Sequence, residues 1–182
     1  GLTKAGANVS EIEFAPAQIG AQLNGVLATL IAGGIRHDML PYLTAAGAPV
    51  KTPEDLAAYN LQDPQTRIPF QQSTLDSSVV NTDVKDAAEY QDAITQIKAA
   101  AVAALEQAFA DSQADVLVSV NNYHSQVYAT ANYPAITFSL GKRANGMPVG
   151  VVLIGKPGEE AKLLSYAYAL EQATLGNRLL VS

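Results

Sequence analysis

The sequence contains no cysteine and no tryptophan, and charged residues make up only 15% of its 182 residues. Without cysteine, the chain cannot form disulfides, use a thiol in catalysis or bind zinc through thiolates. This absence leaves both reducing and oxidising compartments open. The charged fraction is below the roughly 25% of an average soluble domain. It indicates that part of the surface packs against something else.

Basic residues are also few, because 11 Lys and Arg stand against 17 Asp and Glu, giving a net charge of −6. Nucleic-acid binding requires a basic face that releases counterions, so we expect no nucleic-acid partner. Anionic membranes are disfavoured for the same reason. No apolar run approaches the roughly 20 residues that a membrane span needs, and the first residues lack the apolar region of a signal peptide. We therefore expect no membrane partner.

Several catalytic motifs are missing as well. The sequence has no G-x-S-x-G elbow of the kind that Ser-His-Asp hydrolases use. Its two histidines, His37 and His124, lie far apart and without metal-binding spacing, so we expect no metal site. Gly150–Lys156 matches the first part of a phosphate-binding loop, but Pro157 replaces the Ser or Thr that would hold magnesium. We accordingly expect no nucleotide to bind at this motif.

The C-terminal segment carries the clearest structural signals. Two apolar runs flank Asn145-Gly146, which predicts a β-hairpin whose two turn residues both adopt positive φ. Pro157-Gly158 ends the second strand, and a helix with one apolar stripe is expected to follow. The runs are Ala135–Leu140 and Val149–Ile154, the helix runs from Glu159 to Gly176, and the stripe is Leu163, Leu164, Ala167 and Leu170.

The rest of the chain predicts helices with two further strands. Gly1–Gly6 resembles the tail of a helix that ends at Gly6, and Thr52 is expected to cap a short helix. Near-continuous apolar strands indicate a sheet covered on both faces. The order favours one α/β unit over residues 1–182, with a mixed β-sheet flanked by helices. Expected strands are Asn8–Phe14 and Ala114–Val120; expected helices are 17–33, 35–43, 52–60 and 83–111; expected connections are 61–81 and 121–131.

Five motifs stand in order between Tyr133 and Thr174. They are Tyr133-Pro-Ala-Ile-Thr, Gly146-Met-Pro-Val-Gly150, Ile154-Gly-Lys-Pro157, Glu160-Ala-Lys-Leu-Leu164 and Tyr166-Ala-Tyr-Ala-Leu-Glu-Gln-Ala-Thr174. Together they resemble the C-terminal segment of the amidase signature family, serine hydrolases that cleave amides. A looser similarity to the peptide-amidase-like branch extends over the preceding residues, in Tyr42-Leu43, Thr52–Leu56 and Asn60.

The resemblance implies hydrolysis of a carbon–nitrogen amide bond through an acyl-enzyme, without metal or organic cofactor. The family uses a serine, a bridging serine and a lysine, with the nucleophile in a Gly/Ser-rich signature. No such signature is present, and Ser77-Ser78, the one serine pair, has no glycine nearby. No catalytic residue is therefore assigned. We expect this chain to be the C-terminal portion of a larger amidase, with the remaining N-terminal part as its partner.

Two consequences and one alternative follow from this interpretation. The chain alone is expected to be inactive, and the whole enzyme is expected to act on a small amide or peptide-amide substrate. Two departures from the family pattern, Asn132 in place of glycine and Ser139-Leu140 in place of Pro-Ala, leave the substrate class open. The alternative is a non-catalytic binding or subunit-interaction domain that retains the amidase scaffold.

The candidate substrate-binding residues are Asn121, Asn122 and Tyr123, which follow the expected strand Ala114–Val120. Ligands of open α/β sheets gather outside the carboxyl ends of strands, and in the family the loop at this position looks toward the active-site cleft. The alternative is an ordinary loop whose asparagines satisfy turns. His124 could lie at a pocket mouth, but we favour an exposed loop histidine.

Overall fold

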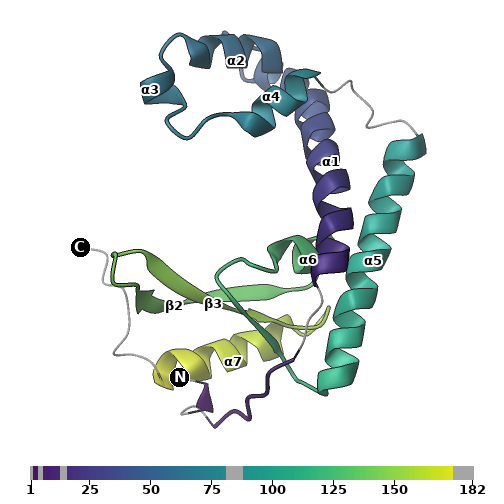
Figure 1. Ribbon diagram of the computed structural model, residues 1–182, viewed down its shortest axis with the longest axis vertical. Helices are drawn as coiled ribbons and strands as arrows, with labels where there is room; N and C mark the ends of the chain where they lie inside the picture. The colour runs from purple at the N-terminus through teal and green to yellow at the C-terminus, as the bar shows by residue number, and fades with distance from the viewer. Residues whose placement is uncertain (1, 4–5, 13–15, 81–87, 174–182) are drawn as a thin grey trace. The chain divides into compact units, whose positions relative to one another are not determined.

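The computed structural model describes residues 2–3, 6–12, 16–80 and 88–173 of the chain (Figure 1). The chain forms two compact units. We call residues 1–20 with 98–182 the sheet unit and residues 21–97 the helical unit. The expectation of one α/β unit over the whole chain stays a prediction.

The elements alternate between long helices, short helices and three strands. No helix of the described residues is long and apolar enough to cross a bilayer. In chain order the elements are α1 Pro16–Ala45, α2 Pro53–Leu61, α3 Pro64–Arg67, α4 Ser73–Val80, α5 Ala88–Ser112, β1 Leu117–Val120, α6 Ser125–Thr130, β2 Ala135–Lys142, β3 Pro148–Ile154 and α7 Glu160–Ala173.

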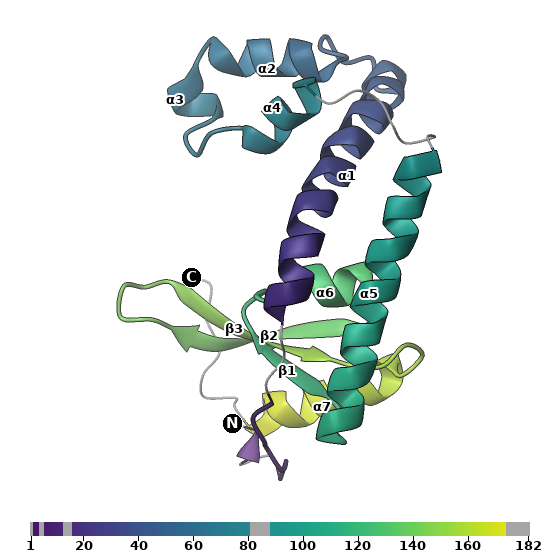
Figure 2. The same ribbon diagram turned by 45° about the vertical axis from the view of Figure 1, so that its right-hand side comes forward.

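The three strands form one sheet in the order β1-β3-β2. Both pairings are antiparallel, and Ile154 lies opposite Leu117 of β1 and Ala135 of β2. In the sheet unit, α7 lies on one side of the sheet and α6 on the other (Figures 1 and 2). The predicted α/β class is confirmed, and the pairings among the described strands are antiparallel.

The core of the sheet unit lies between β3 and α7. Val151 and Leu153 pack with Leu163 and Leu170, and each of the four is at most 5% exposed. The predicted apolar stripe of α7 is confirmed except at Leu164, which is 60% exposed. One residue turns a helical side chain by about 100°, so Leu164 leaves the face that its neighbour Leu163 occupies.

The predicted hairpin is confirmed, but its turn differs from the expectation. The Gly146 N–H donates to the Arg143 carbonyl over 2.9 Å, and Gly146 has a φ of 82°. Asn145 does not share this positive φ; its side-chain oxygen accepts from the Met147 N–H at 3.1 Å. The loop is longer than a two-residue turn, and a single glycine in the left-handed region is enough to close it.

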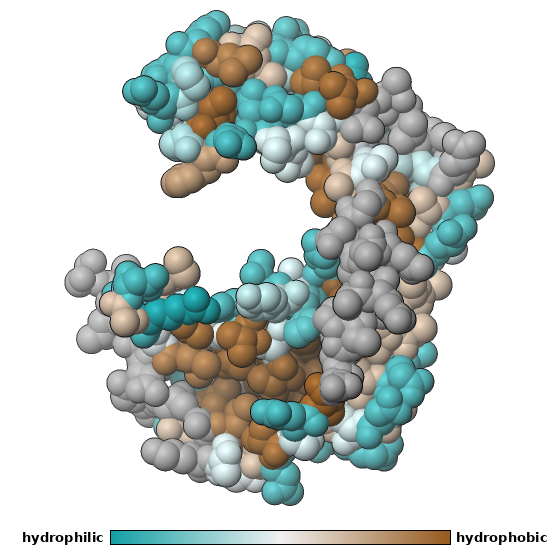
Figure 3. Space-filling view, in the orientation of Figure 1, coloured by the Kyte–Doolittle hydropathy of each residue, from teal (hydrophilic) through white to brown (hydrophobic). Residues whose placement is uncertain are grey.

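Strand β1 is shorter than expected and is buried on one face only. Leu117 and Ser119 are buried, whereas Val118 is 46% and Val120 50% exposed. Cover on both faces is therefore correct for residues 151–154 of β3 and wrong for β1, which lies at the edge of the described sheet. Figure 3 shows apolar surface gathered over the strands and α7 of this unit.

The two predictions for the N-terminal residues, a turn at Gly6 and a strand over Asn8–Phe14, have different outcomes. Gly6 has a φ of 88°, and the N–H groups of Gly6 and Ala7 donate to the carbonyls of Thr3 and Leu2 at 3.1 Å each. These bonds and this φ are those of a glycine turn like the one that closes helix C-termini, while residues 1, 4 and 5 of the predicted helix tail lie outside the described ones. The expected strand Asn8–Phe14 is wrong over residues 8–12, which are exposed and form no strand, because they pair with no described strand. Its last two residues lie outside the described ones.

In the helical unit, α1 continues through Gly33-Gly34, where we expected an interruption. The Tyr90 hydroxyl of α5 donates to the Leu30 carbonyl of α1 at 3.2 Å. A Cβ on Gly34 would lie 3.6 Å from that hydroxyl oxygen. Glycine costs a helix about 1 kcal/mol relative to alanine, and tertiary packing of α1 outweighs that local cost.

The segment expected to be an irregular connection contains the short helices α3 and α4. Asp63 caps α3, since its side-chain oxygen accepts from the Thr66 N–H at 3.4 Å, and Pro64 stands at the first helical position. Thr52 caps α2 as predicted, accepting from the Asp55 N–H at 3.1 Å. Helices of one or two turns have too few residues to show a period, so the expectation failed there.

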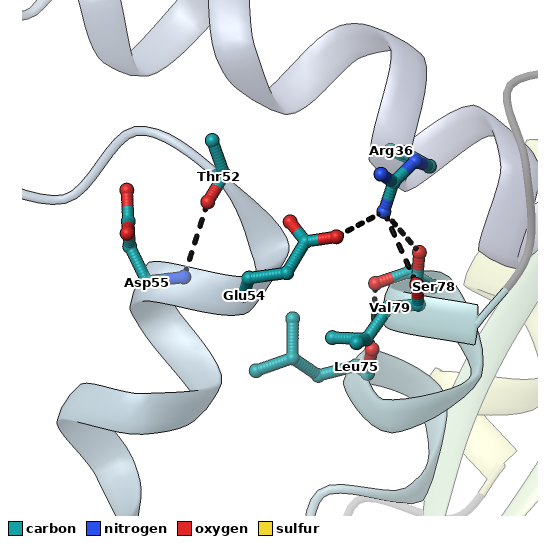
Figure 4. Close-up of polar contacts among 7 residues, drawn as sticks. All are labelled: Arg36, Thr52, Glu54, Asp55, Leu75, Ser78 and Val79. Atoms are coloured by element: carbon teal, nitrogen blue, oxygen red, sulfur yellow. Dashed lines mark hydrogen bonds and ion pairs between the residues drawn. The ribbon is translucent and has the colours of Figure 1, made fainter.

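Arg36 of α1 links three helices of this unit (Figure 4). Its Nη1 forms an ion pair with the Glu54 carboxylate of α2 at 2.5 Å. The same nitrogen donates to the Ser78 and Val79 carbonyls, at 3.1 and 3.3 Å, in the last turn of α4. The Arg36 guanidinium lowers the pKa of the Glu54 carboxyl. A cation at the carboxyl end of α4 also complements its helix dipole.

The long helix predicted over 83–111 is confirmed as α5, whose expected start falls outside the described residues. Its predicted apolar positions are buried at Tyr90, Ile97, Ala101, Leu105 and Phe109.

Candidate functional site

The site-like region is the turn of residues 121–124, which we call the 121–124 turn, between β1 and α6. Asn121 begins it with a φ of 52°. Its backbone N–H donates to the Gly150 carbonyl, and its side-chain oxygen accepts from the Gly150 N–H, each at 2.9 Å. The side chain thus takes the place of a backbone carbonyl in the ladder with β3, while the chain turns away.

Gly150 makes this pairing possible. A Cβ there would lie 3.1 Å from the Phe138 carbonyl oxygen and 3.3 Å from the Thr137 methyl. A side chain there would require these neighbours on β2 to shift by a few tenths of an ångström. Asn121, predicted to bind substrate, is therefore fixed by two hydrogen bonds to the central strand.

Asn122 and Tyr123, the other two predicted residues, lie exposed on the turn. The Asn122 carbonyl accepts from the Ser125 N–H at 3.0 Å, and the Tyr123 N–H donates to the Val120 carbonyl at 3.4 Å. The Tyr123 side chain is 80% exposed. The structure thus places all three residues in sequence at the carboxyl end of β1, and their role in substrate binding stays a prediction.

His124 is not the exposed loop histidine that we favoured. It is half-buried at the N-cap of α6, a helix that lies within the expected connection 121–131. The His124 carbonyl accepts from the Val127 N–H at 3.0 Å. Its ring Nδ1 lies 2.8 Å from the Ser119 hydroxyl oxygen. Burial lowers the pKa of His124 below its ordinary value of 6.5, so the ring is neutral at pH 7.

Ser119 is the polar residue that the sequence interpretation missed. It is 3% exposed and lies opposite Val152 on the buried face of β1. The available signal was a single serine within an otherwise apolar strand, at the position that alternation with Leu117 turns inward. A buried hydroxyl needs a partner, and His124 supplies it.

Two residues just before β2, Asn132 and Tyr133, form the second region of interest. Asn132 has a φ of 59°, and it stands where the family pattern has glycine. Asparagine tolerates the left-handed region better than most residues, so it can occupy this position in place of glycine. The next residue, Tyr133, stacks on Phe109 with centroids 6.3 Å apart, and burial followed by the charge of Glu106 raises its pKa.

These arrangements do not form a reacting pair. Ser119 and His124 have the spacing of a nucleophile and base, but the serine hydroxyl is buried and is not presented to a substrate. Among the residues that the structure describes, no cluster of His, Asp and Glu could hold a metal ion. The amide of Asn122 and the ring and hydroxyl of Tyr123 are exposed and suit hydrogen bonding to a polar, uncharged ligand.

Comparison with solved structures gives related folds. The peptide amidase of Stenotrophomonas maltophilia is similar with a TM-score of 0.71 and 26% identity, over 87% of this chain and 35% of that one. An amidase family protein from Bacillus anthracis is similar with a TM-score of 0.66 and 30% identity, over 79% of this chain and 28% of that one. This chain therefore spans about a third of these relatives.

Comparison with curated sequences agrees. A glutamyl-tRNA(Gln) amidotransferase subunit of Roseobacter denitrificans is 47% identical over 58 residues, which are 32% of this chain and 12% of that protein. A probable amidase of Arabidopsis thaliana is 34% identical over 71 residues, 39% of this chain and 14% of that protein. Residues 3–164 match the Amidase family. With most of its length matched, the chain belongs to the Amidase family.

Proposed function

We propose that this chain is the C-terminal portion of an amidase of the peptide-amidase-like branch, which hydrolyses a carbon–nitrogen amide bond. The reacting serine, the bridging serine and the lysine precede residue 1 in this proposal. The chain contributes sheet strands, covering helices and part of the substrate-binding surface. No metal or organic cofactor takes part in the proposed reaction.

The observation that carries this proposal is the family match over residues 3–164, joined to partial coverage of the relatives. The likeness to the S. maltophilia peptide amidase extends over 87% of this chain but only 35% of that enzyme. The sequence also lacks the Gly/Ser-rich signature and any lysine that can be matched to the family's base. A segment with the fold of the family and without its reacting groups fits a contributing part of the enzyme.

The exposed edge of the sheet supports an N-terminal partner. Among the described strands, β1 pairs with β3 only, which leaves its other edge unpaired. Val118 and Val120 on this strand are 46% and 50% exposed. Natural domains protect such edges by covering or pairing them. We propose that the remaining part of the same amidase covers this edge.

The 121–124 turn is the proposed substrate-binding element. Asn121 fixes the turn to β3, and Asn122 and Tyr123 remain available to bind a small amide or peptide amide. An amide group offers one acceptor and at least one donor, and the Asn122 side chain offers the complementary pair. Tyr123 adds an aromatic surface with a hydroxyl.

Ammonia release from an amidated dipeptide tests the proposal. We expect the product of the full gene to release ammonia and the 182-residue chain alone to release none. Asn122→Ala in the full product is expected to raise KM by about two- to tenfold, the range for one lost neutral hydrogen bond. Asn145→Ala, on the exposed hairpin loop, is the matched control with unchanged kinetics. Ammonia release by the 182-residue chain, or an unchanged KM in Asn122→Ala, would contradict the proposal.

A second candidate is a non-catalytic binding or subunit-interaction domain that retains the scaffold. It is favoured by Leu164 and Tyr168, one helical turn apart on α7 and 60% and 65% exposed. The gene discriminates between the two candidates. A reading frame without the Gly/Ser-rich signature, whose product releases no ammonia, supports this second function.

A further inference from the structure

The 121–124 turn is held at two points that differ in chemistry. At its start, Asn121 forms two hydrogen bonds of 2.9 Å with Gly150. At its end, the His124 ring lies 2.8 Å from the Ser119 hydroxyl of β1. The first attachment contains no group that titrates near neutral pH, whereas the second contains an imidazole. Acidification can therefore act on one attachment and leave the other intact.

The direction of the Ser119–His124 hydrogen bond follows from satisfying the serine. The Ser119 hydroxyl is buried at 3% exposure, and within the described part of the chain its side chain has one hydrogen-bond partner, Nδ1 of His124. If Nδ1 carried the hydrogen, the hydroxyl hydrogen would have no acceptor in a buried site, which is costly. The satisfied arrangement has the hydroxyl donating to an unprotonated Nδ1 and the hydrogen of the neutral ring on Nε2.

Protonation of His124 opposes this arrangement. An imidazolium carries hydrogen on both nitrogens, so Nδ1–H would face the hydroxyl hydrogen. The hydroxyl would have to rotate toward the buried face of β1, where Val152 lies opposite at 2% exposure. His124 also stands at the N-cap of α6, where a positive charge meets the positive end of the backbone dipoles.

The surroundings of His124 disfavour the charged ring, because burial lowers its pKa. Lys98 of α5 brings a positive charge near α6, with its Nζ 3.1 Å from the Asn132 amide oxygen in the favoured orientation of that amide. Asn132 follows the carboxyl end of α6, at the opposite end from His124.

We propose that Ser119 and His124 are a positioning pair, which holds Asn122 and Tyr123 in one conformation while His124 is neutral and releases them when His124 takes up a proton. The part of this inference that concerns substrate rests on the proposed function. The part that concerns the turn does not. Neither residue touches the substrate in this proposal, and both act through the 121–124 turn.

Nuclear magnetic resonance of the full gene product tests the turn directly. The ¹⁵N signals of His124 are assigned by their loss in His124→Gln, and His37→Gln is the control that removes the chain's other histidine. We expect an unprotonated Nδ1 at pH 7.5 and amide signals of residues 121–123 that move together with the His124 titration below pH 6.5. A hydrogen on Nδ1 at pH 7.5, or turn amides indifferent to that titration, would overturn the inference.

Two variants separate positioning from a merely structural contribution. Ser119→Ala removes the donor, so we expect the turn amides to take the low-pH positions at every pH. His124→Asn places an amide oxygen where Nδ1 was, an acceptor that does not titrate, so we expect turn amides that no longer depend on pH. Turn signals unchanged from wild type in Ser119→Ala, with the fold intact, would also overturn the inference.

Kinetics add a readout on substrate. We expect KM of the full product to rise about two- to tenfold between pH 7.5 and a pH below the His124 titration that resonance locates, the range for one lost neutral hydrogen bond, and His124→Asn to remove this rise. Asn121→Ala, which breaks the other attachment, is expected to raise KM equally at both pH values. If no ammonia is released, the proposed function is wrong. The resonance measurements then still test whether Ser119 and His124 position the 121–124 turn. A pH-dependent KM that survives in His124→Asn would overturn it.

Discussion

The two units of the chain are stabilised in different ways. In the sheet unit, β3 presents Val151 and Leu153 to α7, and the buried groups are almost all apolar. In the helical unit, hydrogen bonds and an ion pair join the short helices. Arg36 joins α1, α2 and α4, and Asn60 donates to Gln72 at 3.0 Å. Apolar burial therefore stabilises the sheet unit, whereas a charged residue, Arg36, links the helices of the helical unit.

This difference has a physical reason in element length. A strand of seven residues such as β3 places alternate side chains on one face along its whole length, so it can share a continuous core with a helix. Helices of four to nine residues bury few side chains: α2 buries Pro53 and Ala57, α4 buries Ser78, and α3 buries none. Their positions are then fixed by caps and by hydrogen bonds to their ends.

The largest expected effect is in the apolar core. Leu153→Ala removes a side chain that is 1% exposed, and we expect a loss of about 2–5 kcal/mol in the free energy of unfolding. Denaturant unfolding measures it, and hydrogen exchange is expected to show the loss in the sheet unit. Leu164→Ala, at 60% exposure, is the matched control, expected within about 0.5 kcal/mol of wild type. Equal effects from the two leucines would remove the distinction between the buried core of β3 and α7 and the exposed face of α7.

A smaller effect is expected for the polar link of the helical unit. Arg36→Met keeps the aliphatic stem but loses the hydrogen bonds to the Ser78 and Val79 carbonyls. We expect a loss of about 1–2 kcal/mol, with faster hydrogen exchange in α4 and no change in the strands. Arg143→Met on the exposed hairpin loop serves as control. Unchanged exchange in α4 would mean that Arg36 does not hold that helix.

A stabilising change is expected at Gly34. Alanine there would place its Cβ 3.6 Å from the Tyr90 hydroxyl oxygen, an ordinary contact. Replacing glycine inside a helix is expected to gain about 0.5–1 kcal/mol, measured as a higher unfolding midpoint. Gly146→Ala is the contrasting variant, because its φ of 82° disfavours any side chain, and it is expected to destabilise. A loss of stability in Gly34→Ala would show that α1 needs glycine for close packing.

The smallest expected effect concerns acid. Arg36 lowers the pKa of Glu54 below its ordinary value of 4.5 in the folded protein. The contribution of this pair is therefore present above pH 4.5 and is lost as pH falls through the lowered pKa. Resonance titration of the Glu54 carboxyl should show the lowered pKa in wild type and a return toward 4.5 in Arg36→Met. A Glu54 titration that is the same in both proteins would contradict the assignment.

Local signals were sufficient wherever one short stretch determines the structure. Thr52 before Pro53 indicated the cap of α2, and Gly6 indicated the turn that closes residues 2–7. The apolar runs around Asn145-Gly146 predicted the hairpin of β2 and β3. In each case the residues that decide the conformation are neighbours in sequence, so propensity and spacing are enough.

Contacts between distant residues account for the failures. Gly33-Gly34 lies within an intact helix because α5 packs there through Tyr90, 60 residues from Leu30. Asn121 was predicted from its position after a strand, but its pairing with Gly150 depends on the register of β1 and β3. The Ser119–His124 bond needed both the strand and α6, and a helix of six residues shows no period. The candidate site was therefore located by sequence, while its hydrogen bonds were not.

The strand order has a consequence for the growing polypeptide. β3 lies between β1 and β2 but is made after both, so on the ribosome the two earlier strands emerge without their partner. The β2–β3 hairpin closes over a short loop at low entropic cost, while β1 must close over a longer one that contains α6 and β2. We therefore expect the hairpin to form first and β1 to dock last. Until β1 docks, its residues Val118 and Val120 would be exposed, and such exposed apolar strands are prone to aggregation.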